Sequence, residues 1–149
     1  LGLLFFLTDL RVERVHALMA NHGLPLDLVD AMTVQFAGDA LGVIGGTGNA
    51  GRNYKLGITL YCEAGAVDID TVSQHALIRR ADGSREGLGF ERGLDSRFLP
   101  AHNLVDVVLG RAPNFASGAV GWRAVELLDA AYRSAQDDGR AVRVAELYK

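Results

Sequence analysis

The sequence is poor in the features that mark secreted, membrane-spanning and nucleic-acid-binding proteins. Its one cysteine, Cys62, cannot form a disulfide within the chain, which is typical of a reducing compartment, so we expect a cytoplasmic protein. Its 15 lysines and arginines are outnumbered by 18 aspartates and glutamates, which disfavours a nucleic-acid partner because phosphate contacts need clustered basic side chains. Its apolar opening, residues 1–7, is far shorter than the roughly 20 residues that cross a bilayer, so we expect no membrane segment.

The histidines and the cysteine show no pattern that binds a metal. His16, His22, His75 and His102 lack the i, i+4 spacing of a zinc-binding helix, and one cysteine supplies too few thiolates. Cys62 falls on the apolar side of a predicted strand, so we expect a small buried hydrophobic side chain there rather than a nucleophile. We therefore expect no metal site in this chain.

Alternation of apolar and polar residues predicts β-strands in the first two thirds of the chain. Residues 28–37 and 54–62 alternate over their whole length, as half-buried strands do. Shorter strands are expected at residues 41–44, 66–70, 75–80 and 142–144. The dipeptide at Asp82 and Gly83 predicts a hairpin turn, and the 18 glycines indicate tight turns in general.

A helical period replaces this alternation in the last third of the chain. Residues 96–109 and 117–138 are predicted helices, with Ser96 and Ser117 as N-caps. Their expected inward stripes are Ala101, Leu104, Val105 and Val108 in the first helix, and Gly121, Val125, Leu128, Tyr132 and Ala135 in the second. We expect these helices to cover the apolar side of residues 54–62, which carries Leu56, Ile58 and Leu60. Propensity alone predicts a further helix over residues 12–20.

The segment from Gly46 to Gly51 fits the pattern G-x-G-x-x-G that binds dinucleotides. It follows an apolar strand, and Asp68 or Asp70 lies about 20 residues on, where a ribose ligand is expected. A dinucleotide site also needs a helix that begins at the third glycine, because the helix N-terminus holds the pyrophosphate. The residues that follow alternate with a period of two, so a loop between antiparallel strands is favoured. A self-contained nucleotide-binding enzyme stays an alternative.

Several segments of the chain together resemble the C-terminal part of Gfo/Idh/MocA oxidoreductases, a family that includes glucose–fructose oxidoreductase and inositol dehydrogenase. The resemblance is carried by residues 118–132 with 139–142, by residues 103–114, and by residues 27–36, 42–44 and 63–66. It covers nearly the whole chain, and the order and spacing of its motifs make it specific although each motif is short.

This resemblance implies an α+β fold built on a largely antiparallel open sheet with helices packed on one face. Residues 1–149 would form a single C-terminal domain, which shapes the substrate site and the subunit interface. The N-terminal Rossmann domain, which binds NAD or NADP in the family, would be absent, and the chain would begin inside a longer protein. Residues 12–20 would be a strand, against their propensity. The parent would be a dehydrogenase of the sugar or cyclitol type, with a small-molecule substrate.

The chain departs from the family where the catalytic residues are expected. It contains no Glu-Lys-Pro tripeptide, which carries the family's catalytic lysine. The family's His-x-x-Asp pair would place its histidine before Leu1, and Gly2 occupies the position of the acid. We therefore assign no catalytic or cofactor-binding residue, and we expect the chain alone to be inactive. Polar residues of the glycine loop and of a helix start are the candidates for substrate contacts: Asn49, Arg52, Asn53 and His102.

The side of the sheet away from the helices is predicted to form a homo-oligomer. It would carry small or weakly polar residues, namely Val29, Ala31, Thr33, Gln35, Thr59 and Tyr61, whereas a face exposed to water normally carries charged residues. A different class of function stays open beside the oxidoreductase: a non-catalytic, dimeric interaction or ligand-binding module.

Overall fold

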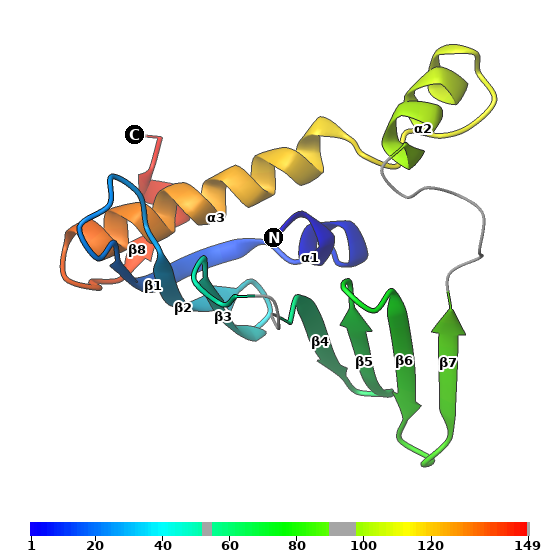
Figure 1. The fold of residues 1–149 in the computed structure, drawn as a ribbon, viewed down its shortest axis with the longest axis horizontal. Coiled ribbons are helices and arrows are strands. Elements are labelled where there is room, and N and C mark those ends of the chain that lie inside the picture. Colours follow the sequence, from blue (N-terminus) through cyan, green and yellow to red (C-terminus); the bar gives the residue numbers. More distant parts are fainter. Residues whose placement is uncertain (52–54, 90–97, 149) are drawn as a thin grey trace. The chain divides into compact units, whose positions relative to one another are not determined.

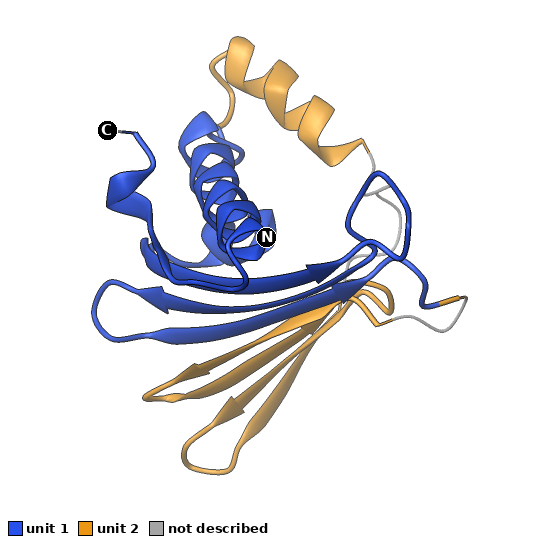
Figure 2. Cartoon of the chain, turned by 90° about the vertical axis from the view of Figure 1, so that its left-hand side faces the viewer, with its two compact units in different colours: residues 1–50, 114–149 blue, residues 51–113 orange. Residues whose placement is uncertain are grey.

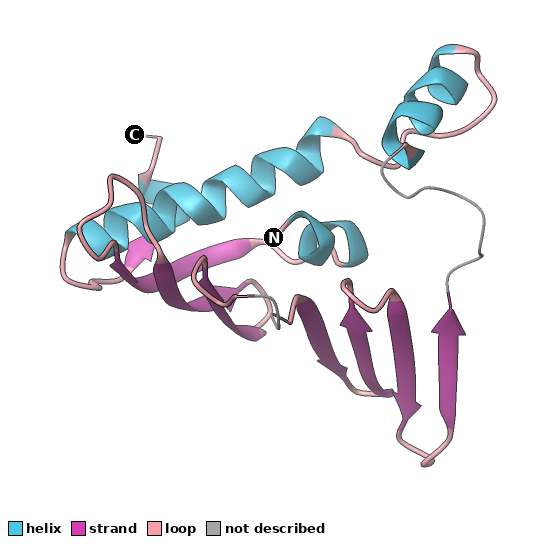
Figure 3. Cartoon of the chain, viewed as in Figure 1, coloured by secondary structure: helices cyan, strands magenta, loops and turns pink. Residues whose placement is uncertain are grey.

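A computed structural model of the chain describes residues 1–51, 55–89 and 98–148, which form two compact units (Figure 2). Unit 1 consists of Leu1–Ala50 and Asn114–Lys149, and unit 2 is Gly51–Pro113. The elements of unit 1 are α1 (Gly2–Leu7), β1 (Val12–Ala20), β2 (Val29–Phe36), β3 (Leu41–Thr47), α3 (Gly118–Gln136), β8 (Val142–Arg143) and a 3-10 turn (Val144–Glu146). The elements of unit 2 are β4 (Gly57–Cys62), β5 (Gly65–Asp70), β6 (His75–Arg80), β7 (Arg85–Gly89) and α2 (Leu99–Val108) (Figures 1 and 3).

The sheet of unit 1 is antiparallel, with the strand order β3-β2-β1-β8, and α3 packs on β1 (Figure 1). The predicted alternation of β2 is confirmed, because Met32, Val34 and Phe36 are buried while Ala31 and Thr33 are exposed. The core of unit 1 combines one face of this sheet with α3, and its buried apolar residues include Val15, Ala17, Leu127, Ala130 and Ala131. The other face of the sheet has no helix on it within the described part of unit 1.

Residues 12–20 form strand β1, so the helix predicted from propensity is wrong and the strand implied by the family resemblance is confirmed. β1 lies between β2, which pairs with it along its length, and β8, which pairs with it at Arg14 and Val15. Val15 and Ala17 are buried against α3. Burial and the two strand neighbours therefore override a modest local preference for helix.

The helix predicted over residues 117–138 is present as α3, but its inward stripe is displaced. The buried residues are Leu127, Ala130, Ala131 and Ser134, one position away from the stripe predicted through Leu128, Tyr132 and Ala135. The predicted members Val125 and Tyr132 are 54% and 42% exposed. Small side chains explain the displacement, because Ala130, Ala131 and Ser134 let the helix backbone approach the sheet closely.

Arg123 of α3 holds the end of α1. Its guanidinium donates hydrogen bonds to the carbonyl oxygens of Phe5, Thr8 and Leu10 at 2.8, 3.1 and 3.4 Å, and it lies 5.4 Å from the centre of the Phe5 ring. Residues from both ends of the sequence are thereby fixed to each other. The backbone carbonyls at the C-terminal end of a helix lack partners within that helix, which explains why a cationic donor is favourable there.

The sheet of unit 2 is a meander of four antiparallel strands in the order β4-β5-β6-β7. The predicted hairpin at Asp82 and Gly83 is confirmed: Gly83 has a φ of +86°, and the Ser84 backbone N–H donates to Asp82 Oδ1 at 2.8 Å. This turn leads into β7, a strand that the sequence pattern did not predict. With two antiparallel sheets and helices, the expected α+β class is confirmed.

Three expectations about burial in unit 2 are wrong. Leu56 is 60% exposed, and Ile58 and Leu60 are only half-buried. No residue of α2 is buried, so its predicted stripe is exposed, with Leu104, Val105 and Val108 at 64%, 56% and 77%. Cys62 is exposed because it ends an edge strand. Ser96, the predicted cap, lies outside the described residues.

Candidate functional site

The glycine-rich segment begins in a strand and continues into a turn: Gly46 and Thr47 end β3, and Gly48 and Asn49 form the turn that follows it. Gly46 lies in β3 opposite Asp30 of β2, and a Cβ atom at Gly46 would stand 2.5 Å from Asp30 Oδ1. The space beside Gly46 is thus filled by a side chain of the same sheet. Further on, Gly57–Cys62 forms β4, as the alternation predicted. The described residues therefore do not fit a dinucleotide, whose pyrophosphate needs glycines that lead directly into a helix.

Two of the four predicted substrate contacts are described by the structure. Asn49 lies in the turn after β3, where its backbone N–H donates to Thr47 Oγ1 at 3.3 Å. His102 is exposed on α2. Arg52 and Asn53 lie outside the described residues. Neither Asn49 nor His102 lines one of the two hollows described below, so a role in substrate binding stays a prediction for all four.

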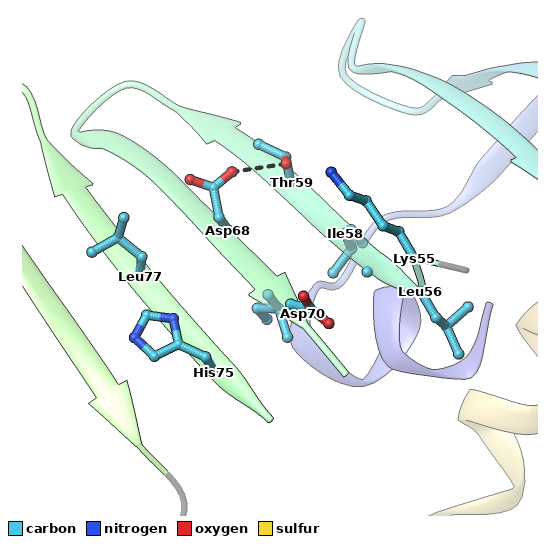
Figure 4. A pocket seen from close by; sticks show the side chains of 10 residues that line it. Lys55, Leu56, Ile58, Thr59, Asp68, Asp70, His75 and Leu77 are labelled. Atoms are coloured by element: carbon cyan, nitrogen blue, oxygen red, sulfur yellow. Dashed lines mark hydrogen bonds between the residues drawn. The ribbon is translucent and has the colours of Figure 1, made fainter. Parts of the chain in front are cut away.

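A hollow of about 470 Å³ lies on one face of the sheet of unit 2 (Figure 4). Its polar lining includes Lys55, Thr59, Asp68, Asp70 and His75, and Leu77 lies beside them. The Thr59 hydroxyl donates to Asp68 Oδ1 at 2.8 Å, which links β4 to β5. The second oxygen of Asp68 forms an ion pair with Arg79 of β6 at 2.7 Å. A polar network thus crosses three strands on this face.

One glycine of the edge strand β4, Gly57, lines the hollow, and the other edge strand, β7, also carries glycines. Gly57 of β4 pairs with Asp70, and a Cβ at Gly57 would stand 2.3 Å from the Ile69 carbonyl oxygen, so a side chain cannot fit there. On the other edge, Gly87 and Gly89 of β7 lie beside β6, where Gly89 pairs with His75. Positions without side chains therefore flank Asp70 and His75 on this face.

The carboxylate of Asp70 is held in its charged form. The backbone N–H of Ser73 has the largest effect, followed by the Ser73 hydroxyl and the Val72 N–H, and the positive charge of Lys55 adds to them, so that the pKa of Asp70 is lowered. These donors bond the carboxylate at the turn between β5 and β6, with Oδ1 at 2.8 and 3.0 Å from the backbone nitrogens of Val72 and Ser73. Chemically, the face offers fixed charges, a hydroxyl and an imidazole to a polar ligand or a charged surface.

The expectation of a weakly polar side is wrong for this sheet. Thr59 and Tyr61 do share one face, but the neighbouring strands place Asp68, Asp70 and Arg79 beside them. Alternation within residues 66–70 puts both aspartates on one side of their strand, so their common face could have been read from the sequence. Which strands lie next to each other could not.

A second hollow, of about 590 Å³, lies in unit 1 between the end of β1, the following loop and the C-terminal half of α3. Its polar lining includes Asn21, His22, Asp27, Tyr132 and Gln136. The Tyr132 hydroxyl donates to Asp27 Oδ1 at 2.5 Å. This hydrogen bond has the largest effect in raising the pKa of Tyr132, ahead of burial and of the negative charges on Asp27 and Asp30, so the phenol stays protonated at neutral pH. The residues that meet here lie 105 apart in the sequence, and no local pattern links them.

Across residues 1–51, 55–89 and 98–148, no three histidine, cysteine, aspartate or glutamate side chains come together to hold a metal ion. Among the helices that the structure describes, none has the length and apolar character to cross a membrane.

Comparison with known proteins identifies the fold but no relative by sequence. No protein-family model matches the chain, and no curated protein sequence matches it. Solved structures do match. An oxidoreductase from Sinorhizobium meliloti superimposes with a TM-score of 0.78 at 16% identity, over 95% of this chain and 49% of that one.

Two further matches are dehydrogenases with named ligands or substrates. The WlbA dehydrogenase from Bordetella pertussis, solved with NADH and UDP-GlcNAcA, has a TM-score of 0.68 at 24% identity, over 95% of this chain and 41% of that one. UDP-N-acetylglucosamine 3-dehydrogenase GnnA from Acidithiobacillus ferrooxidans has a TM-score of 0.73 at 13% identity, over 91% of this chain and 42% of that one. These are oxidoreductases of the Gfo/Idh/MocA type, so the resemblance seen in the sequence is confirmed at the level of the fold. The chain spans less than half the length of each of these structures.

Proposed function

We propose that this chain is the C-terminal domain of an NAD(P)-dependent oxidoreductase of the sugar or cyclitol dehydrogenase type. In this proposal it shapes the substrate site and the subunit interface, and residues 1–149 act as one domain in the cytoplasm. The observation that carries the proposal is the superposition of 95% of the chain on 49% of the Sinorhizobium meliloti oxidoreductase. The nicotinamide cofactor supplies the hydride chemistry in such enzymes, and the protein supplies orientation and proton transfer.

The described residues indicate which part of the parent binds the cofactor and which part contacts the substrate. Because the glycine-rich segment does not fit a dinucleotide, the cofactor belongs to another part of the parent, and this chain contributes polar surface to the substrate. We assign no proton-transfer residue to the chain, since it contains no Glu-Lys-Pro tripeptide and Gly2 occupies the position that the family resemblance gives to the acid.

The reading frame upstream of Leu1 provides the first test. We expect it to encode a strand, a G-x-G-x-x-G turn and a helix, followed by Glu-Lys-Pro. The full-length product should bind NADH or NADPH, and the chain alone should not, as measured by nicotinamide fluorescence. Micromolar binding by the chain alone that is lost in Gly48→Ala would contradict the proposal and would support the nucleotide-binding alternative.

A non-catalytic, dimeric module is the second candidate, and one surface of unit 1 favours it. The face of the β3-β2-β1 sheet away from α3 exposes large apolar side chains: Leu18 is 64% exposed, Leu41 81% and Val43 86%. Apolar strand residues this exposed commonly mark an interface, and a second copy of the chain is the partner that we propose. An upstream region without dinucleotide-binding sequence, together with a stable dimer, would favour this candidate over the oxidoreductase.

A further inference from the structure

The hollow of unit 1 is formed by two segments that lie far apart in the sequence. The loop between β1 and β2 lines one side of it, and the C-terminal half of α3 lines the other (Figure 1). Its volume of about 590 Å³ falls within the range of sites that hold small organic molecules. Its apolar lining consists of Met19, Ala20, Pro25, Leu26 and Ala135. The hollow therefore offers hydrocarbon contacts as well as polar groups.

The charges at this hollow are negative. Asp27 lines it directly, and its described lining contains no lysine or arginine. Asp30 lies close by, because its charge acts on the phenol of Tyr132, which lines the hollow. The pKa of Tyr132 is raised first by the hydrogen bond to Asp27, then by burial, and then by the charges of both aspartates. The hollow thus has a negative potential that no lysine or arginine of its described lining offsets.

The carboxylate of Asp27 is fixed in place and can accept more hydrogen bonds. The Tyr132 hydroxyl donates to Asp27 Oδ1, and this is the only hydrogen bond that the described residues give to the Asp27 side chain. A carboxylate offers about four acceptor positions on its two oxygens. Because the bond from Tyr132 ties the loop to α3, the remaining acceptor positions of Asp27 are already oriented before any ligand arrives.

Asp30 adds an acceptor that lacks a donor. Its Oδ1 is shielded from solvent and receives no hydrogen bond from any residue that the structure describes. Asp30 pairs with Met19 of β1 and Gly46 of β3, and it points to the same side of the sheet as the buried Met32. A Cβ at Gly46 would stand 2.5 Å from Oδ1, so the glycine leaves the room that this carboxylate occupies. A buried acceptor without a donor is costly, which favours a donor-rich ligand nearby.

We propose that the hollow of unit 1 binds a primary ammonium group attached to a small apolar body, with Asp27 as the hydrogen-bond acceptor and Asp30 as a second negative charge. An ammonium group has three donors and no acceptor, so it complements a site that is rich in acceptors. The apolar lining then contacts the hydrocarbon of the ligand. The proposal goes beyond the proposed function and does not depend on it, since Asp27, Asp30 and Tyr132 all belong to unit 1 of this chain.

Titration with n-butylammonium chloride tests the site on the 149-residue chain. Amide resonances of residues 19–28 and 132–136 should shift in heteronuclear NMR spectra, with a dissociation constant in the millimolar range, because the hollow is open to solvent. n-Butanol and butyrate have the same chain length but no positive charge. Each should bind at least about tenfold more weakly, because neither supplies the charged donor.

Three matched substitutions test the two carboxylates. Asp27→Asn removes the charge but keeps an acceptor for the Tyr132 hydroxyl, and it should weaken butylammonium binding about tenfold. Asp30→Asn should weaken it as well. Asp39→Asn is the control and should leave binding unchanged. Asp39 is an exposed carboxylate in the turn between β2 and β3, at the far end of these strands, and its φ of +66° is one that asparagine tolerates.

Any of three results would overturn the proposal. They are an absence of shifts in residues 19–28 and 132–136, equal binding of n-butanol and n-butylammonium, or equal weakening by Asp39→Asn and Asp27→Asn. The first two do not require any variant to fold. Nα-acetyl-lysine amide separates the sources of the ammonium group. Binding tighter than that of butylammonium supports the site with a lysine side chain of a peptide as its ligand, and weaker binding supports it with a free amine.

Discussion

The Ser134 hydroxyl oxygen accepts a hydrogen bond from the backbone N–H of Ala17 at 2.9 Å, although 117 residues separate the two in sequence. Both residues are buried, with 0% and 2% of their surface exposed. β8 pairs with β1 only at Arg14 and Val15, so beyond that point the side of β1 next to β8 lacks a strand partner. Ser134 supplies the acceptor that the short strand β8 does not reach, and it thereby makes a polar contact between α3 and the sheet.

Replacing Ser134 by alanine should lower the free energy of unfolding by about 1–3 kcal/mol, because the buried N–H of Ala17 loses its acceptor. Urea denaturation followed by circular dichroism measures the change. Ser117→Ala is a matched control, since Ser117 precedes α3 without a side-chain capping bond. Equal losses of unfolding free energy in the two variants would show that the buried hydrogen bond of Ser134 adds nothing to stability.

Arg123→Met should destabilise the attachment of α1 while leaving the sheet of unit 1 intact. The three carbonyls of Phe5, Thr8 and Leu10 lose a shared charged donor, whose hydrogen bonds are worth roughly 1.5–3 kcal/mol each in favourable settings. Hydrogen exchange should therefore speed up in residues 2–10 more than in β2. Arg140→Met serves as the comparison, because Arg140 is in an exposed ion pair of little expected value.

Gly46→Ala should lower the free energy of unfolding more than Gly45→Ala does, although the two glycines are neighbours in β3. A Cβ at Gly46 stands 2.5 Å from Asp30 Oδ1, whereas one at Gly45 stands 3.6 Å from the Asp30 carbonyl oxygen, an ordinary contact. We expect a loss of about 1–2 kcal/mol for Gly46→Ala, by the cost of overpacking. Adding Asp30→Ala should relieve most of that loss; if it does not, the steric explanation is wrong.

The pKa of Tyr132 gives unit 1 a predicted sensitivity to alkaline pH. Because the folded pKa is raised above the unfolded value, the stabilisation is complete below the unfolded pKa and is lost as pH rises through the folded one. Thermal unfolding between neutral and strongly alkaline pH should thus show a steeper decline for the wild type than for Tyr132→Phe. Tyr148 also has a raised pKa, so Tyr148→Phe is measured alongside to separate the two groups. Identical curves for wild type and Tyr132→Phe would contradict the assignment.

The strands were largely predictable from the sequence, because alternation records which residues face a core. β2 and β4 emerged in this way, and their observed bounds fall within the predicted ranges. β7 was not predicted, because its sequence Arg-Glu-Gly-Leu-Gly contains two glycines, which have low strand propensity. It joins the sheet through the hairpin turn that precedes it. β1 needed the family resemblance, because its local preference favours helix.

The position of α3 shows a different limit of sequence reasoning. Its length and period were evident, yet the inward face was predicted one residue away from its observed place. Large apolar residues such as Val125 suggested the stripe, but the helix approaches the sheet through alanines and Ser134. Similarly, the charged face of unit 2 depends on which strands are neighbours, and the contact between Asp27 and Tyr132 joins residues that no periodicity relates.

The order in which the parts leave the ribosome follows from the division of the chain. Unit 2 is one continuous stretch, Gly51–Pro113, whereas unit 1 is assembled from residues on both sides of it. Val15 and Val34 therefore emerge early but obtain their helical cover only when α3 has been translated. During synthesis the residues of unit 1 that precede unit 2 form a nascent sheet with an uncovered apolar side, while unit 2 already has all its strands. This interval is the period in which the growing chain most needs protection from aggregation.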